Sequence, residues 1–296
     1  MTDGEDRALP PHFFDERDPV GELVFEVAAD QGRSFIGSQY HREGLKIMRP
    51  HYLDNSGQAY VTILNPGGGY LGGDDYRIKI AVHKDASLLL TGQSATKVYR
   101  TPDDYAQQDM DLVLEENAVF EYIPDQLILY RGATYNQYMN VAMAASASFL
   151  TSEIVTPGWA PDGSVFGYDE VRMRTAVNVD GKPMVVDNLL IRPKDPNLGA
   201  NSMLFFGDRS HLLTLLAVDR RINDQLVSDV RELVSAFVEE KTSSDIEWGV
   251  TRTAGHGLAL RALGTYTQDL LAMSLTVADY LRGLWRGQGP IDLRKH

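Results

Sequence analysis

Period-two alternation of apolar and polar residues dominates the chain from about Val20 to Val218 and sets the strongest limit on its fold. Residues 76–82 (YRIKIAV) alternate strictly, and residues 170–180 (EVRMRTAVNVD) repeat the same period. Residues 179–183 (VDGKP) predict a hairpin, because Asp-Gly supplies the two positive-φ positions of a type I′ turn. The pattern therefore predicts a long series of short strands joined by turns.

Two later segments have helical spacing instead. Apolar residues recur at helical intervals in residues 219–240 and again in residues 266–286, and both segments carry charge on the opposite face. Thr265 and Gln268 have the spacing of a capping box at the start of the second helix. Between the helices, residues 246–264 predict one or two strands with a glycine turn.

These patterns predict a mainly β protein. We expect one β-rich body over residues 20–296, with the two helices packed at one side. The first 19 residues are acidic and contain prolines, which predicts a flexible N-terminal tail.

Composition excludes several classes of function. The formal net charge is −13, from 28 basic and 41 acidic residues, so nucleic acids and anionic membranes are poor partners. The chain has no cysteine, which excludes disulfides and thiolate metal sites. No apolar run approaches the roughly 20 residues that span a bilayer, and the N-terminus does not resemble a secretory signal. A cytoplasmic protein is expected.

The glycine-rich loop 64–76 (LNPGGGYLGGDDY) raises the question of phosphate binding. A Walker loop would require Gly-Lys-Ser/Thr where Gly73 is followed by two aspartates, and a dinucleotide fingerprint would require a helix where residues 76–82 have strand period. The loop therefore predicts a close-packed turn with positive φ angles. This interpretation does not explain the carboxylates of Asp74 and Asp75.

A serine hydrolase is the alternative function that the motifs suggest. Ser94 and Lys97 match Ser-x-x-Lys, in which the lysine accepts the serine proton one helical turn away. The segment 95–100 alternates as a strand, which would place the two side chains on opposite faces. The motif is therefore a weak indication of catalysis.

Carboxylates, not histidines, are the candidate metal ligands. The seven histidines include no closely spaced pair, whereas eight acidic residues lie among apolar or turn residues of the β region: Asp74, Asp75, Glu121, Asp125, Glu153, Asp169, Glu170 and Asp187. A carboxylate within a strand requires a partner or water. The partner is either an arginine, with Arg100, Arg131, Arg172 and Arg174 as candidates, or a cation held weakly by oxygen ligands.

Tyrosine and arginine also recur together, in residues 97–101 (KVYRT) and 127–135 (LILYRGATY). Both residue types are frequent in protein interfaces. The phrases predict either a protein-binding surface or packing within a sheet.

Long phrases in a fixed order resemble one known family. They are LNPGGGYLGGDDY, LLLTGQSATKVYRT, FEYIPDQLILYRGATY, SEIVTPGWAPDGSVFGYDEVRMRT, VVDNLLIRP, LALRALG and, at the end of the chain, LRGLWRG with DLRK. From about Gly32 to the C-terminus the chain closely resembles the urease accessory protein UreD, also called UreH.

The resemblance implies a β-helix-like stack of many strands with two helices, and a scaffold that is not an enzyme. Such proteins bind the urease apoprotein subunits and UreF, which recruits the GTPase UreG, and UreE often donates the metal. Nickel is bound only transiently, and the family is proposed to carry it through an internal acidic tunnel.

The resemblance and the carboxylate pattern together give the predicted site residues. The predicted nickel path consists of Glu121, Glu153, Glu170, Asp74 and Asp75, with Ser94 and Thr96 as neutral oxygens beside it. The predicted partner-binding residues are Tyr280, Leu284 and Trp285 on the second helix.

Overall fold

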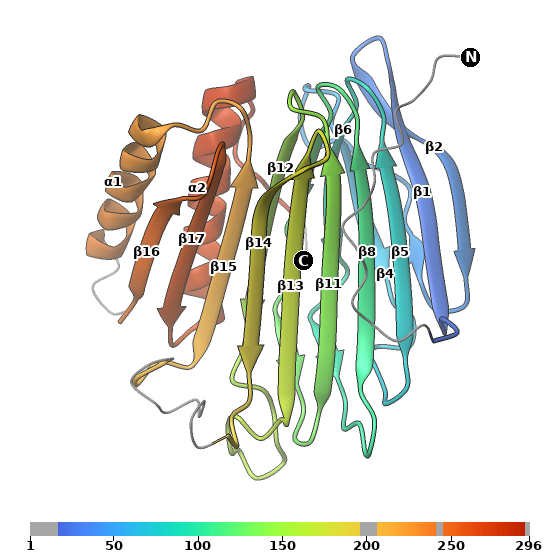
Figure 1. The fold of residues 1–296 in the computed structure, drawn as a ribbon, viewed down its shortest axis with the longest axis vertical. Helices are drawn as coiled ribbons and strands as arrows, with labels where there is room; N and C mark the ends of the chain where they lie inside the picture. The colour runs from blue at the N-terminus through green and yellow to red at the C-terminus, as the bar shows by residue number, and fades with distance from the viewer. Residues whose placement is uncertain (1–16, 196–205, 241–244, 294–296) are drawn as a thin grey trace.

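Two β-sheets stacked face to face form the body of the computed structural model, and two helices lie behind one of them (Figure 1). The structure describes residues 17–195, 206–240 and 245–293. Most of the tail predicted over residues 1–19 lies outside these ranges.

The first sheet has seven strands in the order β14-β13-β11-β8-β5-β1-β2. Their bounds are β1 Gly21–Asp30, β2 Arg33–Arg42, β5 Asp75–Val82, β8 Ala106–Leu114, β11 Thr134–Met143, β13 Glu170–Val179 and β14 Lys182–Ile191. We call this sheet A.

The second sheet, sheet B, follows the order β16-β17-β15-β12-β9-β6-β4-β3, with β7 and β10 attached beside β12. Its strands are β3 Lys46–Ile47, β4 Ala59–Leu64, β6 Ser87–Gly92, β7 Thr96–Val98, β9 Val119–Tyr122, β10 Leu127–Leu129, β12 Ser148–Val155, β15 His211–Val218, β16 Glu247–Arg252 and β17 Gly257–Gly264.

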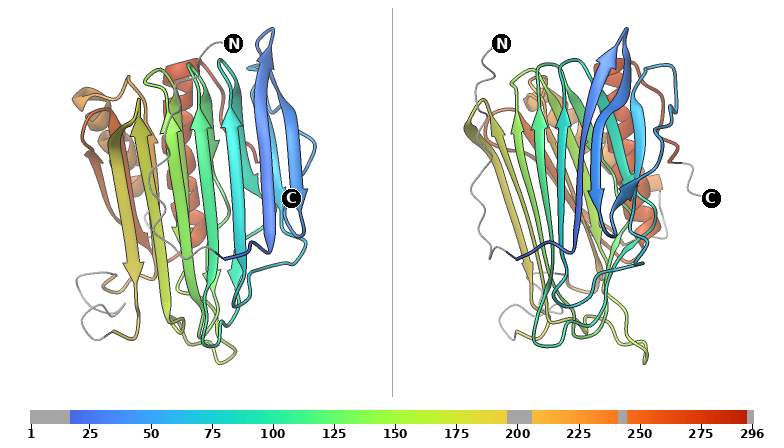
Figure 2. Two further views of the ribbon diagram at one scale, coloured as in Figure 1. Left: turned by 45° about the vertical axis from the view of Figure 1, so that its right-hand side comes forward. Right: turned by 90° about the vertical axis from the view of Figure 1, so that its right-hand side faces the viewer.

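The chain crosses repeatedly from one sheet to the other, which produces a solenoid-like stack (Figure 2). Strands β5, β8, β11 and β13 are parallel neighbours in sheet A, and β4, β6, β9 and β12 are parallel neighbours in sheet B. The fold is therefore mainly β with a β-helix-like stack, as predicted.

In-register packing of apolar side chains explains why the sheets stack. Ile78, Met110 and Met139 occupy matching positions on three adjacent strands of sheet A, and each is at most 2% exposed. Together with the inner residues of sheet B they form the main core. A second core lies between the outer face of sheet B and the helices. Alternate residues of the sheet B strands thus contribute to two different cores, one on each face of the sheet.

The helices occupy the C-terminal half, α1 at Asp224–Glu240 and α2 at Thr267–Arg286. The first begins later than predicted because Asn223 caps it, accepting a hydrogen bond from the Leu226 amide at 2.9 Å. The predicted capping box of Thr265 and Gln268 is wrong, because Tyr266 is the N-cap residue and makes no side-chain capping bond. Within the described residues, neither helix is long and apolar enough to cross a membrane.

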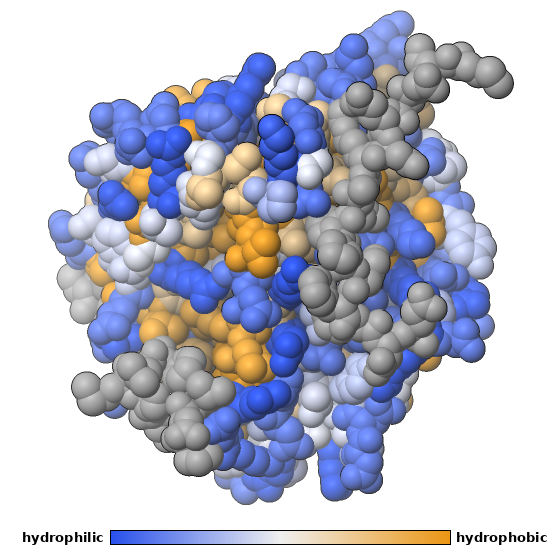
Figure 3. Space-filling view, viewed as in Figure 1, coloured by the Kyte–Doolittle hydropathy of each residue, from blue (hydrophilic) through white to orange (hydrophobic). Residues whose placement is uncertain are grey.

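The hairpin predicted at residues 179–183 and the close-packed turn predicted for the glycine-rich loop 64–76 are both present. Asp180 and Gly181 have φ angles of 45° and 73° between the antiparallel strands β13 and β14. In the glycine loop, Gly69 packs so closely that an added Cβ would lie 2.6 Å from the Tyr99 ring. Figure 3 views the molecule from the outer side of sheet A; the visible surface is mostly hydrophilic, with a group of apolar residues near the centre of the view.

Candidate functional site

Glu153 lies between the two sheets, where most side chains are apolar. Alternate residues of β12 contribute to different cores: Phe149 and Val155 face sheet A, whereas Leu150 and Ile154 face the helices. Glu153 shares the parity of the first pair, so its carboxylate points into the space between the sheets. Gln137 on β11 donates a hydrogen bond to it from the facing sheet.

The surroundings of Glu153 disfavour its negative charge. Burial and, to a smaller extent, the nearby Asp187 carboxylate raise the pKa of Glu153 to about 7, although the hydrogen bond from the Gln137 amide acts in the opposite direction. The carboxyl is therefore divided between its neutral and charged forms near neutral pH.

Two small cavities meet at Glu153. One has a volume of about 20 Å³ and is also lined by Thr96, Gln108, Asp125 and Gln137. The other has a volume of about 10 Å³ and is also lined by Thr151, Thr175, Asp187 and Thr214. Each has about the volume that one water molecule requires. Polar side chains thus line a short interior track on both sides of Glu153.

Asp125 and Asp187 join this track although neither was among the predicted path residues. Asp187 lies on β14 opposite Thr175 of β13, and the Arg261 guanidinium of sheet B donates a hydrogen bond to it. The alternation of β14 could have identified Asp187 from the sequence, because Asp187 lies on the same face of the strand as the core residues Val185 and Ile191.

Glu121 is also buried, but on the opposite face of sheet B. Its neighbours Phe120 and Tyr122 face the main core, so its own side chain points toward α2. There it accepts hydrogen bonds from the guanidinium groups of Arg282 and Arg286, and from Gln58 Nε2 at 3.0 Å. Glu121 therefore anchors the end of α2 to the sheet and does not line either of the two cavities.

The other predicted carboxylates lie on different surfaces. Asp75 is fully buried on the outer side of β5 and forms an ion pair with Arg77 at 3.1 Å, while Asp74 accepts a hydrogen bond from the Leu71 amide in the glycine loop. Glu170, at the start of β13, forms ion pairs with Arg172 and Arg192. None of the three lines the cavities at Glu153.

The serine motif lacks the helical geometry that its chemistry requires. Ser94 is exposed in a bend, and Lys97 lies in the short strand β7. Thr96, in contrast, lines the cavity that contains Glu153. Of the two predicted neutral oxygens, the structure places only Thr96 beside the interior track.

The predicted partner-binding residues of α2 differ in their exposure. Leu284 is 58% exposed, whereas Tyr280 and Trp285 are partly buried against the second core. The Arg221 guanidinium lies 4.9 Å from the centre of the Trp285 ring. Leu284 is the one member of this group that is free to contact another protein.

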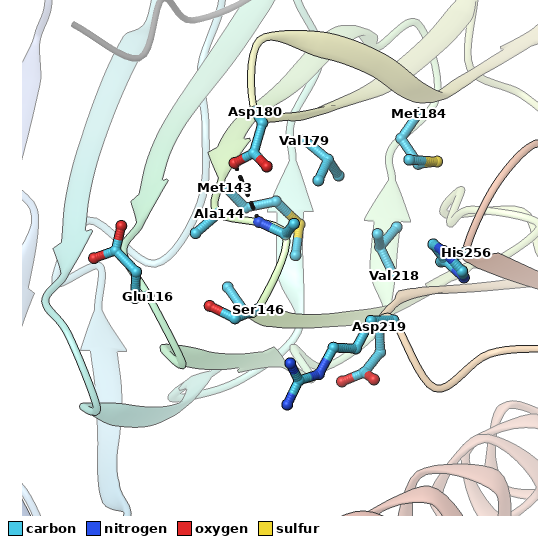
Figure 4. A pocket seen from close by; sticks show the side chains of 13 residues that line it. Glu116, Met143, Ala144, Ser146, Val179, Asp180, Met184, Val218, Asp219 and His256 are labelled. Atoms are coloured by element: carbon cyan, nitrogen blue, oxygen red, sulfur yellow. Dashed lines mark hydrogen bonds between the residues drawn. The ribbon is translucent and has the colours of Figure 1, made fainter. Parts of the chain in front are cut away.

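A larger cavity of about 420 Å³ opens at the other end of the sheets, among the turns that follow β8, β11, β13 and β15 (Figure 4). Met143, Met184 and Val218 supply apolar walls, and Asp180 accepts a hydrogen bond from the Ala145 amide at its rim. Across the described residues, no group of three or more histidine and acidic side chains is arranged to hold a metal ion.

Comparison with known proteins places this architecture in a family. The sequence profile described as UreD urease accessory protein matches residues 20–295. The urease accessory protein UreD of Actinomyces naeslundii is 45% identical over 277 residues, covering 94% of this chain and 99% of that protein. Its counterpart from Arthrobacter sp. (strain FB24) is 43% identical over 286 residues, covering 94% of both chains. That of Corynebacterium glutamicum (strain ATCC 13032) is 40% identical over 282 residues, covering 94% and 98%. The chain therefore belongs to the UreD family of urease accessory proteins.

Proposed function

We propose that the protein is a non-catalytic cytoplasmic scaffold for urease maturation, and that nickel on its way to the urease apoprotein passes between sheets A and B. In this proposal UreF binds the scaffold and recruits the GTPase UreG, while UreE acts upstream as a metal donor. These partners are the ones that the resemblance to UreD implies.

The observation that carries the proposal is the carboxylate of Glu153, which no arginine or lysine neutralises in the described part of the chain. Gln137 is its hydrogen-bond donor, and burial raises its pKa to about 7. A divalent cation beside this group would provide the positive charge that its surroundings lack. Nickel would therefore displace the carboxyl proton and bind where the charge is otherwise disfavoured.

The ligands along the track suit transfer of the metal more than storage. Carboxylate and hydroxyl oxygens bind a borderline transition metal less tightly than imidazole or thiolate does. Asp125 and Thr96 lie on one side of Glu153 and Asp187 on the other, so a cation would meet one or two carboxylates at each step. Because each cavity has the volume of about one water molecule, protein oxygens would replace much of the hydration shell.

This proposal keeps Glu153 and Thr96 from the predicted path and adds Asp125 and Asp187. Glu121, Glu170, Asp74, Asp75 and Ser94 are left out because none of them lines the two cavities at Glu153. The alternative of a serine hydrolase has no support from the geometry around Ser94 and Lys97.

The test is Glu153→Gln, which preserves the shape of the side chain and removes its charge. The full chain is co-expressed with the urease subunits and the other accessory proteins in limiting nickel. We expect several-fold fewer nickel ions per purified urease, with the accessory complex still recovered by affinity purification. Glu170→Gln and Ser94→Ala are the matched controls and should leave nickel loading unchanged. Full loading of urease by the Glu153→Gln variant would contradict the proposed path.

A further inference from the structure

Four apolar side chains form a row across successive turns of the stack, at the end of the molecule where β5, β8, β11 and β13 begin. Tyr130 pairs with Trp159, and its ring centroid lies 4.8 Å from that of Trp159 and 4.9 Å from that of Tyr99. Tyr70 forms a parallel bridge with Val98, and the Tyr99 amide donates a hydrogen bond to the Tyr70 carbonyl. Leu71 therefore lies beside Tyr99 at the matching position of the adjacent turn. We call Leu71, Tyr99, Tyr130 and Trp159 the apolar row.

The apolar row is open to solvent at both ends. Leu71 is 57% exposed and Trp159 is 50% exposed, while the two tyrosines between them are partly buried. Elsewhere, the matching residues of successive turns, such as Ile78, Met110 and Met139, are enclosed between the sheets. A row that only stabilised the stack would not require a tryptophan half exposed at its edge.

Cations lie directly beside the apolar row. Arg100 and Arg131 follow Tyr99 and Tyr130 in the sequence, and Gly132 and Gly167 leave space for their side chains: an added Cβ would lie 3.3 Å from Arg100 Cγ and 3.4 Å from Arg131 Cγ. Asp162 and Ser164 hold the Arg131 guanidinium. Among the described residues, Arg100 and Lys97 make no ion pair and no side-chain hydrogen bond.

We propose that the apolar row and its cations bind an acidic segment, bearing at least one large apolar side chain, of another protein in the urease maturation assembly. This inference rests on the proposed function. Tyrosine, tryptophan and arginine contribute most to the binding energy of protein interfaces. On a chain with a net charge of −13, unpaired cations beside exposed aromatic rings favour an anionic partner.

A second copy of this chain fits the surface less well. Two chains that each carry a net charge of −13 repel one another, and a symmetric contact would bring the cations of both copies together. The chemistry of the surface is satisfied better by a segment whose carboxylates reach Lys97 and Arg100 while an apolar side chain covers Leu71 or Trp159.

The test uses the affinity-tagged full chain, co-expressed with the urease subunits and the other urease accessory proteins, each quantified after purification. The variants are Leu71→Glu with Trp159→Glu, and Arg100→Glu alone. We expect the double variant to lose at least ten-fold of one identified partner and Arg100→Glu to lose several-fold. Val186→Glu is the matched control, because this apolar residue is 60% exposed elsewhere on the molecule. The control should retain the partner, and Leu284→Glu tests the competing surface on α2.

Each other outcome would overturn the inference. Loss of the partner from Leu284→Glu, with retention by the row variants, would move the docking surface to α2. Equal capture of the partner by every variant would contradict the proposed docking site alone. Failure of the wild-type chain to capture any partner would contradict the proposed function as well. Self-association that depends on the apolar row would assign the surface to a second copy. Should the double variant fail to fold, Arg100→Glu carries the test, since this exposed side chain makes no ion pair among the described residues.

Discussion

Glu121 and Glu153 lie on adjacent strands of the same sheet, yet their carboxylates have opposite surroundings. Glu121 projects from β9 toward α2 and contacts two guanidinium groups. Glu153 projects from β12 toward sheet A and contacts one amide. Glu121 is buried and Glu153 is partly buried, so a difference in exposure does not explain why Glu121 has the arginine partners.

The difference lies in the charge that accompanies each carboxylate. Arg282 is 1% exposed, and it and Arg286 both form ion pairs with Glu121, so the negative charge of this carboxylate is compensated. The charged group that acts on the pKa of Glu153 is another acid, Asp187, which already receives a hydrogen bond from Arg261. A compensated carboxylate holds a structure together, whereas an uncompensated one is suited to receive a cation.

The largest effect should come from Glu121→Ala. Removal of this carboxylate leaves the buried Arg282 and the partly buried Arg286 without their main counter-charge, which costs about 3–5 kcal/mol of the free energy of unfolding. Urea denaturation followed by circular dichroism measures the loss.

A triple substitution sharpens this prediction. Glu121→Leu with Arg282→Met and Arg286→Met replaces the three charged side chains by apolar groups, so it should recover much of the stability that Glu121→Ala loses. If the single variant were as stable as the wild type, the Glu121 cluster would not be the anchor of α2.

A smaller, pH-dependent effect is expected at Glu153. Its pKa is about 7 in the folded chain and 4.5 for an unperturbed glutamate, so the folded state binds the proton more tightly. The stabilising effect of the proton is fully present below pH 4.5 and declines as the pH rises to about 7. Ionisation of Glu153 should cost about 3 kcal/mol at pH 8.

The measurement is the free energy of unfolding of the wild type and of Glu153→Gln between pH 5 and pH 8. The variant has no ionisable group here, so its advantage over the wild type should grow up to about pH 7 and then level off. A difference between the two chains that does not change with pH would mean that Glu153 is ionised throughout, and the contrast with Glu121 would disappear.

Sequence alone predicted the series of strands and the two helices, but not which carboxylates point inward. The same alternation that identified the strands also assigns Glu121 and Glu153 to opposite faces, because Phe120 and Tyr122 flank the one while Phe149 and Val155 share the parity of the other. The faces were therefore available from local pattern.

Charge partners could not be predicted in this way. Arg282 lies 161 residues from Glu121 in the sequence, and only the packing of α2 on sheet B brings the two together. Of the four arginines predicted to pair with strand carboxylates, Arg172 does so through Glu170, whereas Arg131 pairs with Asp162 in a loop. Long-range contacts such as these decide whether a carboxylate is neutralised, and spacing along the chain does not record them.

The smallest effect should come from Glu170→Gln. Glu170 resembles Glu121 in contacting two arginines, but the side chains of Arg172 and Arg192 are 36% and 43% exposed, so water stabilises all three charges. Ion pairs of this kind contribute about 0.2–1 kcal/mol, and the contribution falls as salt screens them. Urea denaturation at low and high ionic strength should therefore show a loss below about 1 kcal/mol that shrinks with salt. A loss as large as that of Glu121→Ala would mean that the number of arginines, and not their burial, makes a carboxylate structural.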